Sequence, residues 1–230
     1  MCGRMTLKTA PSEWGQLLLP LVNADVLGGW EPRYNIAPTQ DILAVASDPE
    51  DHSPALDYFR WGLVPGWASD LSIGNRMINA RMETLPEKRS FSGPLNKRRC
   101  LIIADGYYEW QKMPNGKKQP WWITPAKQST MLIAGLWETN RKATGTPIRT
   151  CTIITTSANQ SLSQIHDRMP IVLEFEAAEK WLDQEADGQA AYSLLQPIAD
   201  DYFSMRQVST YVNNARHEGQ QCIEEVQSLF

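Results

Sequence analysis

Short runs of branched and aromatic residues recur along the chain and are separated by Gly, Pro, Asn and Asp. Apolar runs bounded by turn residues are typical of β-strands. They predict strands at residues 41–47, 55–63, 99–110, 119–125, 130–137 and 149–156. The segment PNGKKQ at 114–119 predicts a hairpin turn on Asn115-Gly116, because Asn-Gly readily adopts the positive φ angles of such turns.

Helical patterns are fewer and lie at 11–21 and 174–185, the second with acidic residues in its first turn. Strands dominate without a regular βαβ alternation, which indicates an α+β fold on a mostly antiparallel, barrel-like sheet with flanking helices. No G-x-G-x-x-G follows a strand, so a Rossmann fold is disfavoured. The sequence contains no repeat, low-complexity tract or linker, and residues 1–230 are therefore predicted to form one domain.

Composition narrows the class of protein. Hydrophobic residues make up 42% of the chain and charged residues 21%, which is typical of a globular protein and excludes wholesale disorder. The longest apolar stretch, at 17–22, contains a proline and is too short for a signal peptide or a membrane span. We expect a soluble protein without a membrane partner.

Cysteine spacing argues against a metal centre. The chain has three histidines and four widely separated cysteines, with no C-x-x-C pair. Structural zinc sites need closely grouped Cys and His ligands. We therefore expect no metal, and free thiols in a reducing compartment. The cysteines are Cys2, Cys100, Cys151 and Cys222.

Charge is distributed unevenly. Residues 76–99 contain seven basic and two acidic side chains, a net charge of +5, whereas the whole chain carries −4. Such a stretch can neutralise phosphates, or it can be a solvated loop of mixed charge, and charge alone leaves both open.

Two tryptophans precede this basic stretch in RWGLVPGWASD. Exposed aromatic rings beside basic residues stack on unpaired bases in proteins that bind single strands. Trp61 lies at a strand end and is expected in the core. Trp67 lies between Gly66 and Ala68 in a predicted loop, which favours a contact surface.

Cys2 directly follows the initiator methionine, an unusual place for a structural thiol because chain ends fray and bury little. Cysteine is small enough for Met1 to be removed, which would leave an amine and a thiol on neighbouring carbons. Cys2 is therefore either an ordinary second residue or a paired nucleophile.

Three further polar residues could support chemistry, and each also has a structural interpretation. Glu109 in DGYYEW has aromatic neighbours, and if they desolvate its carboxyl group they would raise its pKa toward a general acid–base role. Alternatively, Glu109 is simply a solvated residue at the end of a strand. His166 in QIHDRMP is suited to proton transfer at neutral pH, or is a satisfied surface residue. Asn79 in NARMET is most simply a turn or cap residue.

Six stretches occur together and in order: MCGR at 1–4, RYNIAPTQ at 33–40, RWGLVPGW at 60–67, INARMET at 78–84, ADGYYEW at 104–110 and IHDRMP at 165–170. Together they resemble the SOS-response-associated peptidase (SRAP) family, which includes abasic-site shielding proteins of bacteria and eukaryotes. The resemblance implies a single α+β domain on a barrel-like sheet. Its catalytic positions fall on Cys2, Asn79, Glu109 and His166.

The same resemblance suggests which residues contact DNA. These are Arg4, Asn35, Pro38, Trp67, Arg81 and Arg89, with Thr155 near the site. The segment after Trp67 varies in length within the family, so loop contacts there are the least transferable.

The activity that the resemblance implies is covalent capture of abasic sites in single-stranded DNA, shielding the lesion during the DNA damage response. The processed amine of Cys2 would form a Schiff base with the opened sugar, and the thiol would close a thiazolidine. Removal of Met1 by the protein itself would account for the peptidase in the family name. We expect no cofactor, a monomer, and a cytoplasmic, nucleoid-associated protein if the source is bacterial.

Two other functions stay open on the sequence alone. N-terminal-nucleophile glutamine amidotransferases also begin Met-Cys-Gly, although no spaced glutamine-binding signature follows here. A non-covalent single-strand DNA-binding module with an incidental Cys2 is the other. Covalent trapping of abasic DNA without borohydride separates these two alternatives from abasic-site capture, because only abasic-site capture predicts an adduct.

Overall fold

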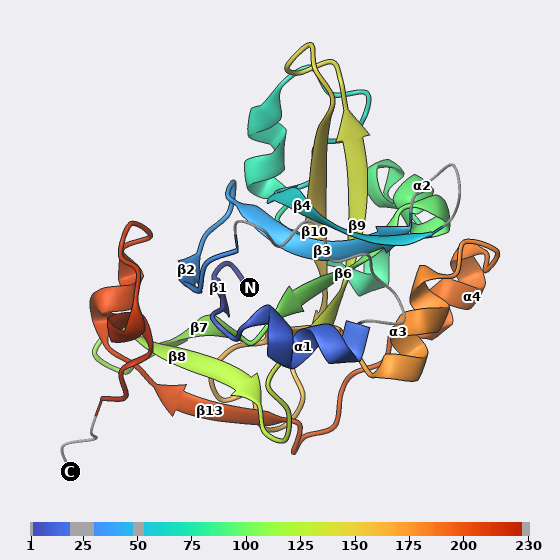
Figure 1. The fold of residues 1–230 in the computed structure, drawn as a ribbon. Coiled ribbons are helices and arrows are strands. Elements are labelled where there is room, and N and C mark those ends of the chain that lie inside the picture. The colour runs from blue at the N-terminus through green and yellow to red at the C-terminus, as the bar shows by residue number, and fades with distance from the viewer. Residues whose placement is uncertain (1, 19–29, 48–52, 227–230) are drawn as a thin grey trace.

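Two β-sheets organise the chain, and most of their strands are the apolar runs of the sequence (Figure 1). The computed structural model describes residues 2–18, 30–47 and 53–226. Met1, whose removal is predicted, lies outside these ranges.

Five strands of the larger sheet close into a barrel, because each pairs with two of the others: β3 (Asp41–Ser47), β4 (Pro54–Trp61), β10 (Ile148–Ser157), β9 (Met131–Asn140) and β6 (Arg99–Ala104). The pairing of β4 with β10 is parallel and the other four are antiparallel. Three short strands extend this sheet, β5 (Asn79–Arg81), β11 (Arg168–Pro170) and β12 (Val172–Leu173). The predicted α+β fold on a mostly antiparallel, barrel-like sheet is confirmed.

The smaller sheet is antiparallel throughout, in the order β13 (Phe203–Gln207), β8 (Lys118–Pro125), β7 (Gly106–Lys112), β1 (Met5–Leu7) and β2 (Arg33–Ile36). The turn between β7 and β8 contains Gly116 at φ 79°, which confirms the predicted hairpin. One hydrophobic cluster contains buried side chains of both sheets, including Met5, Ile123 and Leu101.

The prediction of one strand at 99–110 is wrong, because the chain leaves the barrel after Ala104 and enters the smaller sheet at Gly106. Asp105 at the break is buried and accepts hydrogen bonds from Thr6 Oγ1 (2.5 Å) and from the backbone N–H groups of Lys8 (2.6 Å) and Thr9 (2.7 Å). A side chain at position 106 would not fit, since a Cβ there would lie 2.3 Å from Trp122 Nε1.

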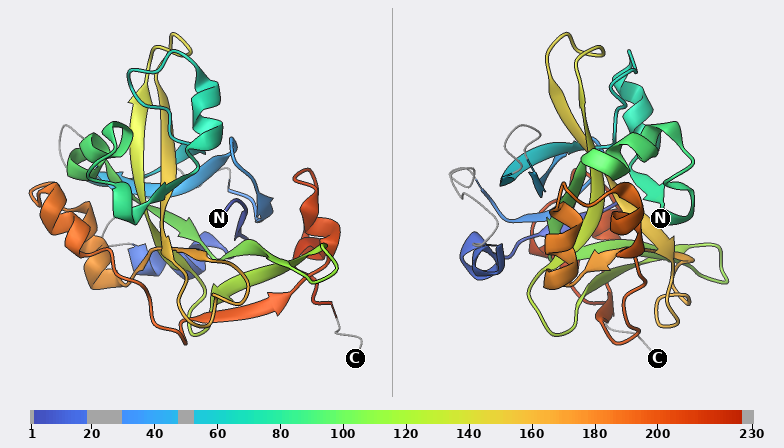
Figure 2. Two further views of the ribbon diagram at one scale, coloured as in Figure 1. Left: turned by 180° about the vertical axis from the view of Figure 1, so that it is seen from behind. Right: turned by 90° about the vertical axis from the view of Figure 1, so that its right-hand side faces the viewer.

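In the described part of the chain, four α-helices flank the sheets: α1 (Pro11–Leu18), α2 (Arg89–Lys97), α3 (Phe175–Leu182) and α4 (Gly188–Ser193). α1 and α3 confirm the two predicted helices, although α3 is shorter than 174–185 and residues 19–21 lie outside the described ranges. α2, α3 and α4 gather on one side of the barrel (Figure 2).

The buried guanidinium of Arg99 fastens these three helices to β6. It donates to the carbonyl groups of Leu95 and Asn96 in α2 and of Trp181 in α3. It also donates to the carbonyl groups of Asp183 and Ala186, which precede α4. α2 was not predicted because its sequence, RSFSGPLNK, contains both Gly and Pro. Its buried residues Phe91, Pro94 and Leu95 supply the packing that compensates.

Asp105→Asn tests how firmly the start of the chain is held. The substitution preserves volume but replaces one acceptor oxygen with an NH₂ donor that faces other donors, so we expect a loss of about 2 kcal/mol in the free energy of unfolding. The measurement is urea unfolding at constant m-value. Asp201→Asn removes an exposed carboxylate paired with Lys127 and should change stability by less than about 0.5 kcal/mol. Equal stability of the two variants would contradict the anchoring role of Asp105.

Candidate active site

From Cys2 onward, the start of the chain runs between the barrel and the smaller sheet (Figure 1). β1 is paired on both edges, with β2 and with β7, and Tyr108 N donates to Arg4 O at 2.9 Å. Cys2 is fully buried, and its carbonyl oxygen accepts a hydrogen bond of 2.7 Å from Asn79 Nδ2. The segment from Cys2 to the end of β1 is therefore held on both sides, as an internal strand is. The structure brings the predicted residues Cys2 and Asn79 together.

Glu109 is buried on β7, with only 3% of its surface exposed. Burial disfavours the carboxylate and raises the pKa of Glu109 to about 7. A carboxyl group with such a pKa is populated in both protonation states near neutral pH, which suits a group that both takes and returns a proton.

His166 faces Glu109 from the loop between β10 and β11, with its Nε2 3.8 Å from Glu109 Oε2. Its Nδ1 accepts a hydrogen bond of 3.0 Å from Arg168 N, which assigns the ring hydrogen to Nε2, on the side of Glu109. Burial lowers the pKa of His166 and favours this neutral form. The exposed Asp167 carboxylate lies 2.9 Å from Nδ1, and its negative charge partly offsets this lowering of the His166 pKa.

The thiol of Cys2 belongs to the same electrostatic system. Burial raises its pKa well above the usual range, and the negative charge of Glu109 raises it further. The thiol therefore stays protonated at neutral pH in this state. It needs a nearby group to take its proton before it can react, and Glu109 is suited to that task.

Arg168 was not predicted as a site residue, although the motif IHDRMP contains it. Its guanidinium makes two bonds to the Glu83 carboxylate, of 2.7 and 3.0 Å, and a third of 2.6 Å to Thr155 O. These contacts fix β11, and with it the loop that carries His166.

A second group of predicted residues lies at the surface. Trp67 is 48% exposed, and the guanidinium carbon of Arg89 lies 5.7 Å from the centre of its ring. Trp61 is buried, as expected. Arg81 is exposed at the end of β5, where it is in register with Thr155 of β10. Thr155 itself is buried.

Arg4 and Asn35 support the wall of the site. Arg4 Nη1 donates to Asn35 Oδ1 (2.6 Å) and to Val212 O (2.8 Å). Asn35 is 1% exposed and donates to the carbonyl groups of Asn214 (3.0 Å) and His217 (2.8 Å). Together they hold segment 212–217 against the start of the chain. Pro38 is half-buried in the turn between β2 and β3. Contact of Arg4, Asn35 and Pro38 with DNA stays a prediction.

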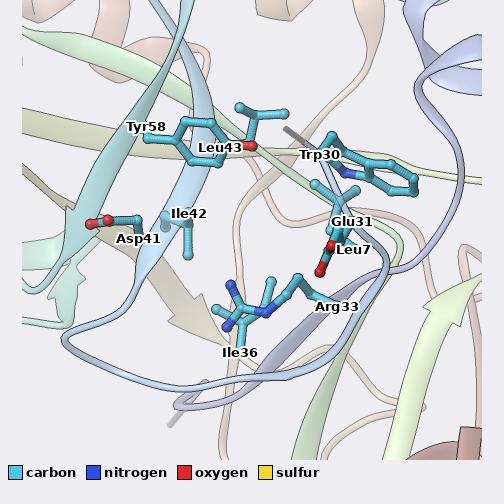
Figure 3. A pocket seen from close by; sticks show the side chains of 9 residues that line it. All are labelled: Leu7, Trp30, Glu31, Arg33, Ile36, Asp41, Ile42, Leu43 and Tyr58. Atoms are coloured by element: carbon cyan, nitrogen blue, oxygen red, sulfur yellow. The ribbon is translucent and has the colours of Figure 1, made fainter. Parts of the chain in front are cut away.

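A hollow of about 360 Å³ opens elsewhere, beside β2, β3 and β4 (Figure 3). Ile36 and Ile42 contribute apolar surface, and Glu31, Arg33 and Asp41 contribute charge. None of the predicted catalytic or DNA-contacting residues lines it. Within the described part of the chain, no group of three or more His, Cys, Asp and Glu side chains could hold a metal ion. In the same ranges, no helix is long and apolar enough to cross a membrane.

Comparison with known proteins places this arrangement in context. A sequence model described as SOS response associated peptidase (SRAP) matches residues 1–215. The chain is 41% identical to abasic site processing protein YoqW of Bacillus subtilis over 228 residues, which cover 97% of this chain and 99% of that protein. It is 34% identical to abasic site processing protein YedK of Escherichia coli, covering 98% and 100%. A solved structure from Bacteroides thetaiotaomicron shares the fold with a TM-score of 0.85 at 23% identity, covering 98% of this chain and 100% of that one.

Glu109→Gln tests the electrostatics of the site. Because the folded state raises the pKa of Glu109 from 4.5 to about 7, wild-type protein loses stability as the pH rises through this interval, by roughly 3 kcal/mol at about 1.36 kcal/mol per pKa unit. Glutamine cannot ionise. The variant should therefore gain stability relative to wild type, and gain more at pH 8 than at pH 5, as measured by urea unfolding at both values.

Glu83→Gln is the matched control. The hydrogen bond from Arg168 lowers the pKa of Glu83, so this residue is ionised at both pH values and its loss should lower stability equally at each. A Glu109→Gln gain that is the same at pH 5 and pH 8 would contradict the raised pKa of Glu109.

Proposed function

The chain belongs to the SOS response associated peptidase family, and we propose that it captures abasic sites in single-stranded DNA covalently through Cys2. Its relatives YoqW and YedK are named abasic site processing proteins, which supports a DNA lesion as the target. The observation that carries the proposal is the position of Cys2. It is fully buried, its carbonyl is held by Asn79, and its thiol shares an electrostatic environment with Glu109.

The first step is removal of Met1, because an amide nitrogen is not a usable nucleophile. Hydrolysis of the Met1–Cys2 bond consumes one water and releases methionine. It leaves Cys2 with an amine and a thiol on neighbouring carbons. We propose that the protein catalyses this step itself, with the thiol of Cys2 as nucleophile and Glu109 as proton carrier, which accounts for a peptidase activity.

The second step opens the sugar and forms a Schiff base. Glu109 takes the proton of the 1′-hydroxyl while His166, protonated on both ring nitrogens for this step, donates its Nε2 proton to the ring oxygen, and the bond between C1′ and that oxygen breaks. Glu109 returns its proton to His166 across the 3.8 Å between their facing atoms. The Cys2 amine then adds to the aldehyde, and loss of water gives a C=N bond. Asn79 orients the amine through the Cys2 carbonyl.

The third step decides between a stable link and strand cleavage. A Schiff base at C1′ invites β-elimination, a lyase-type outcome. The Cys2 thiol can instead add to the C=N carbon, passing its proton through Glu109 to nitrogen, and close a five-membered thiazolidine. This closure is intramolecular, and well-oriented intramolecular reactions reach effective molarities of order 10⁵ M or more. The expected outcome is therefore a link that leaves the strand intact and the lesion shielded.

Single-stranded DNA is the substrate that the surface residues favour. Trp67 offers an exposed ring for stacking on a base, and Arg89 and Arg81 provide positive charge for phosphates. Unpaired bases can stack on such a ring without first opening a duplex. A non-covalent single-strand binding module would use the same surface, and the experiments below separate the two.

Blocking the amine of Cys2 should abolish the adduct. A Gly-Ser extension ahead of Cys2 keeps the thiol but converts the amine to an amide, so DNA should still bind while no heat-stable adduct forms. The measurement is intact mass, with a denaturing gel, after mixing the protein with abasic single-stranded DNA in the absence of borohydride.

Cys2→Ala with Met1 removed is the complementary variant. Its amine can still form the Schiff base, so strand cleavage should replace the stable link, and borohydride should trap the intermediate. A heat-stable adduct with the extended protein would disprove the aminothiol mechanism. Wild-type protein that binds abasic DNA but never gains its mass would leave the non-covalent module as the function.

Arg81→Ala should weaken binding of intact single-stranded DNA and reduce the slope of log K against log salt by about one, the loss of one phosphate contact. The measurement is fluorescence anisotropy over a salt series. Lys127→Ala removes another exposed positive charge, between β8 and β9, and should leave the slope unchanged. Identical slopes for Arg81→Ala and wild type would remove Arg81 from the DNA surface.

A further inference from the structure

Tyr107 lies next to the proposed reaction centre, although sequence motifs gave it no role. It precedes Glu109 by two residues on β7, and residues two apart on a strand point to the same face. Tyr107 and Cys2 belong to the same hydrophobic cluster, whereas Tyr108 belongs to a second one around Trp122 and Val208. The two neighbouring tyrosines therefore serve opposite faces of the sheet, and only Tyr107 is on the face of Cys2.

The two hydroxyl groups differ in the same way. Both side chains are fully buried. Tyr108 Oη donates a hydrogen bond of 2.7 Å to Tyr34 O. Tyr107 Oη has no hydrogen-bond partner among the residues that the structure describes. Burying an unpaired hydroxyl is unfavourable, and phenylalanine would fill the same space against Phe203 without that cost. Packing thus accounts for the ring of Tyr107 but not for its hydroxyl group.

We propose that the Tyr107 hydroxyl is a hydrogen-bond donor to the sulfur of Cys2, and that it makes this bond only as the thiazolidine closes. The inference rests on the proposed function. During closure the thiol proton leaves toward Glu109, the new S–C bond forms, and the electron pair of the C=N bond moves to nitrogen, which receives the proton. Tyr107 keeps its own proton throughout. A bond made in the transition state and absent in the resting state lowers the barrier directly.

The electrostatics of the site make such a donor useful. Burial and the charge of Glu109 both oppose negative charge on the Cys2 sulfur, and a backbone hydrogen bond from Arg4 offsets this only in part. A cationic donor would itself be costly to bury, whereas a phenol is neutral. Burial raises the pKa of Tyr107, and any negative charge on Cys2 or Glu109 raises it further, so the hydroxyl keeps the proton that it shares in a hydrogen bond.

Tyr107→Phe and Tyr108→Phe form a matched pair, because each removes one buried hydroxyl from adjacent residues. Tyr107→Phe should leave Tm unchanged or raise it, while thiazolidine closure slows by about 10- to 100-fold and needs a higher pH to reach half its maximal rate. Tyr108→Phe should lower Tm, because Tyr34 O loses its donor, and should leave the closure rate unchanged.

The assay is a single-turnover reaction in which protein lacking Met1 reacts with abasic single-stranded DNA. Borohydride quenching counts the Schiff base and a heat-stable gel shift counts the closed ring. We expect the Schiff base to accumulate in Tyr107→Phe and to form at the wild-type rate. Closure at the wild-type rate in Tyr107→Phe would overturn the role of Tyr107 and leave the proposed function intact. A wild-type protein that forms no closed ring would overturn both.

Discussion

The rest of the site depends on one constraint, which is that a residue next to the end of the chain has to be held inside the protein. Chain ends ordinarily fray, because nothing pairs with them beyond the last residue. Here β1 is paired on both edges, and Asn79 donates a hydrogen bond to the Cys2 carbonyl. Asp105 accepts hydrogen bonds from the hydroxyl group of Thr6 and from two backbone N–H groups just after β1. The larger sheet contributes Asn79 through β5 and the smaller sheet contributes β7, so both sheets meet at Cys2.

Burial also determines the protonation states of Glu109, Cys2 and His166. Removing Glu109 from water raises its pKa to about 7, and the same exclusion of water keeps the Cys2 thiol protonated and His166 neutral. At neutral pH the thiol and His166 therefore rest uncharged, whereas Glu109 is present both as the acid and as the carboxylate, so it can take a proton in one step and return it in the next. In water Glu109 would have an ordinary pKa and would be a weaker base, although burial also raises the pKa of the thiol that it must deprotonate.

The elements that the sequence predicted well are those whose local pattern agrees with their surroundings. β3 matches its predicted range, and the turn at Gly116 carries its own conformational signature. The run at 99–110 was misread because its residues are apolar on both sides of Asp105, and only the three donors brought from residues 6–9 explain the break there. α2 was missed for a related reason, since its stability comes from packing and from Arg99 rather than from helix propensity.

In the candidate site too, some features are visible in the local sequence and others depend on how the chain packs. The motifs predict Cys2, Asn79, Glu109 and His166 as the catalytic residues, and the structure brings these residues together. The motifs could not distinguish a residue that touches a ligand from one that shapes the wall around it. Asn35 illustrates this, because its amide is committed to the carbonyl groups of segment 212–217 and is nearly inaccessible.

Tyr107 illustrates the opposite case, because a tyrosine in an apolar strand is indistinguishable in sequence from its neighbour Tyr108. In the structure the two differ in the face of the sheet that they occupy and in whether the fold supplies a partner for the hydroxyl group. Whether a buried hydroxyl group has a hydrogen-bond partner depends on three-dimensional packing, and the order of residues in the sequence does not show it. Natural proteins seldom leave a buried polar group unpaired. The missing hydrogen bond of the Tyr107 hydroxyl, beside the proposed nucleophile, has a physical explanation if the reaction supplies its partner.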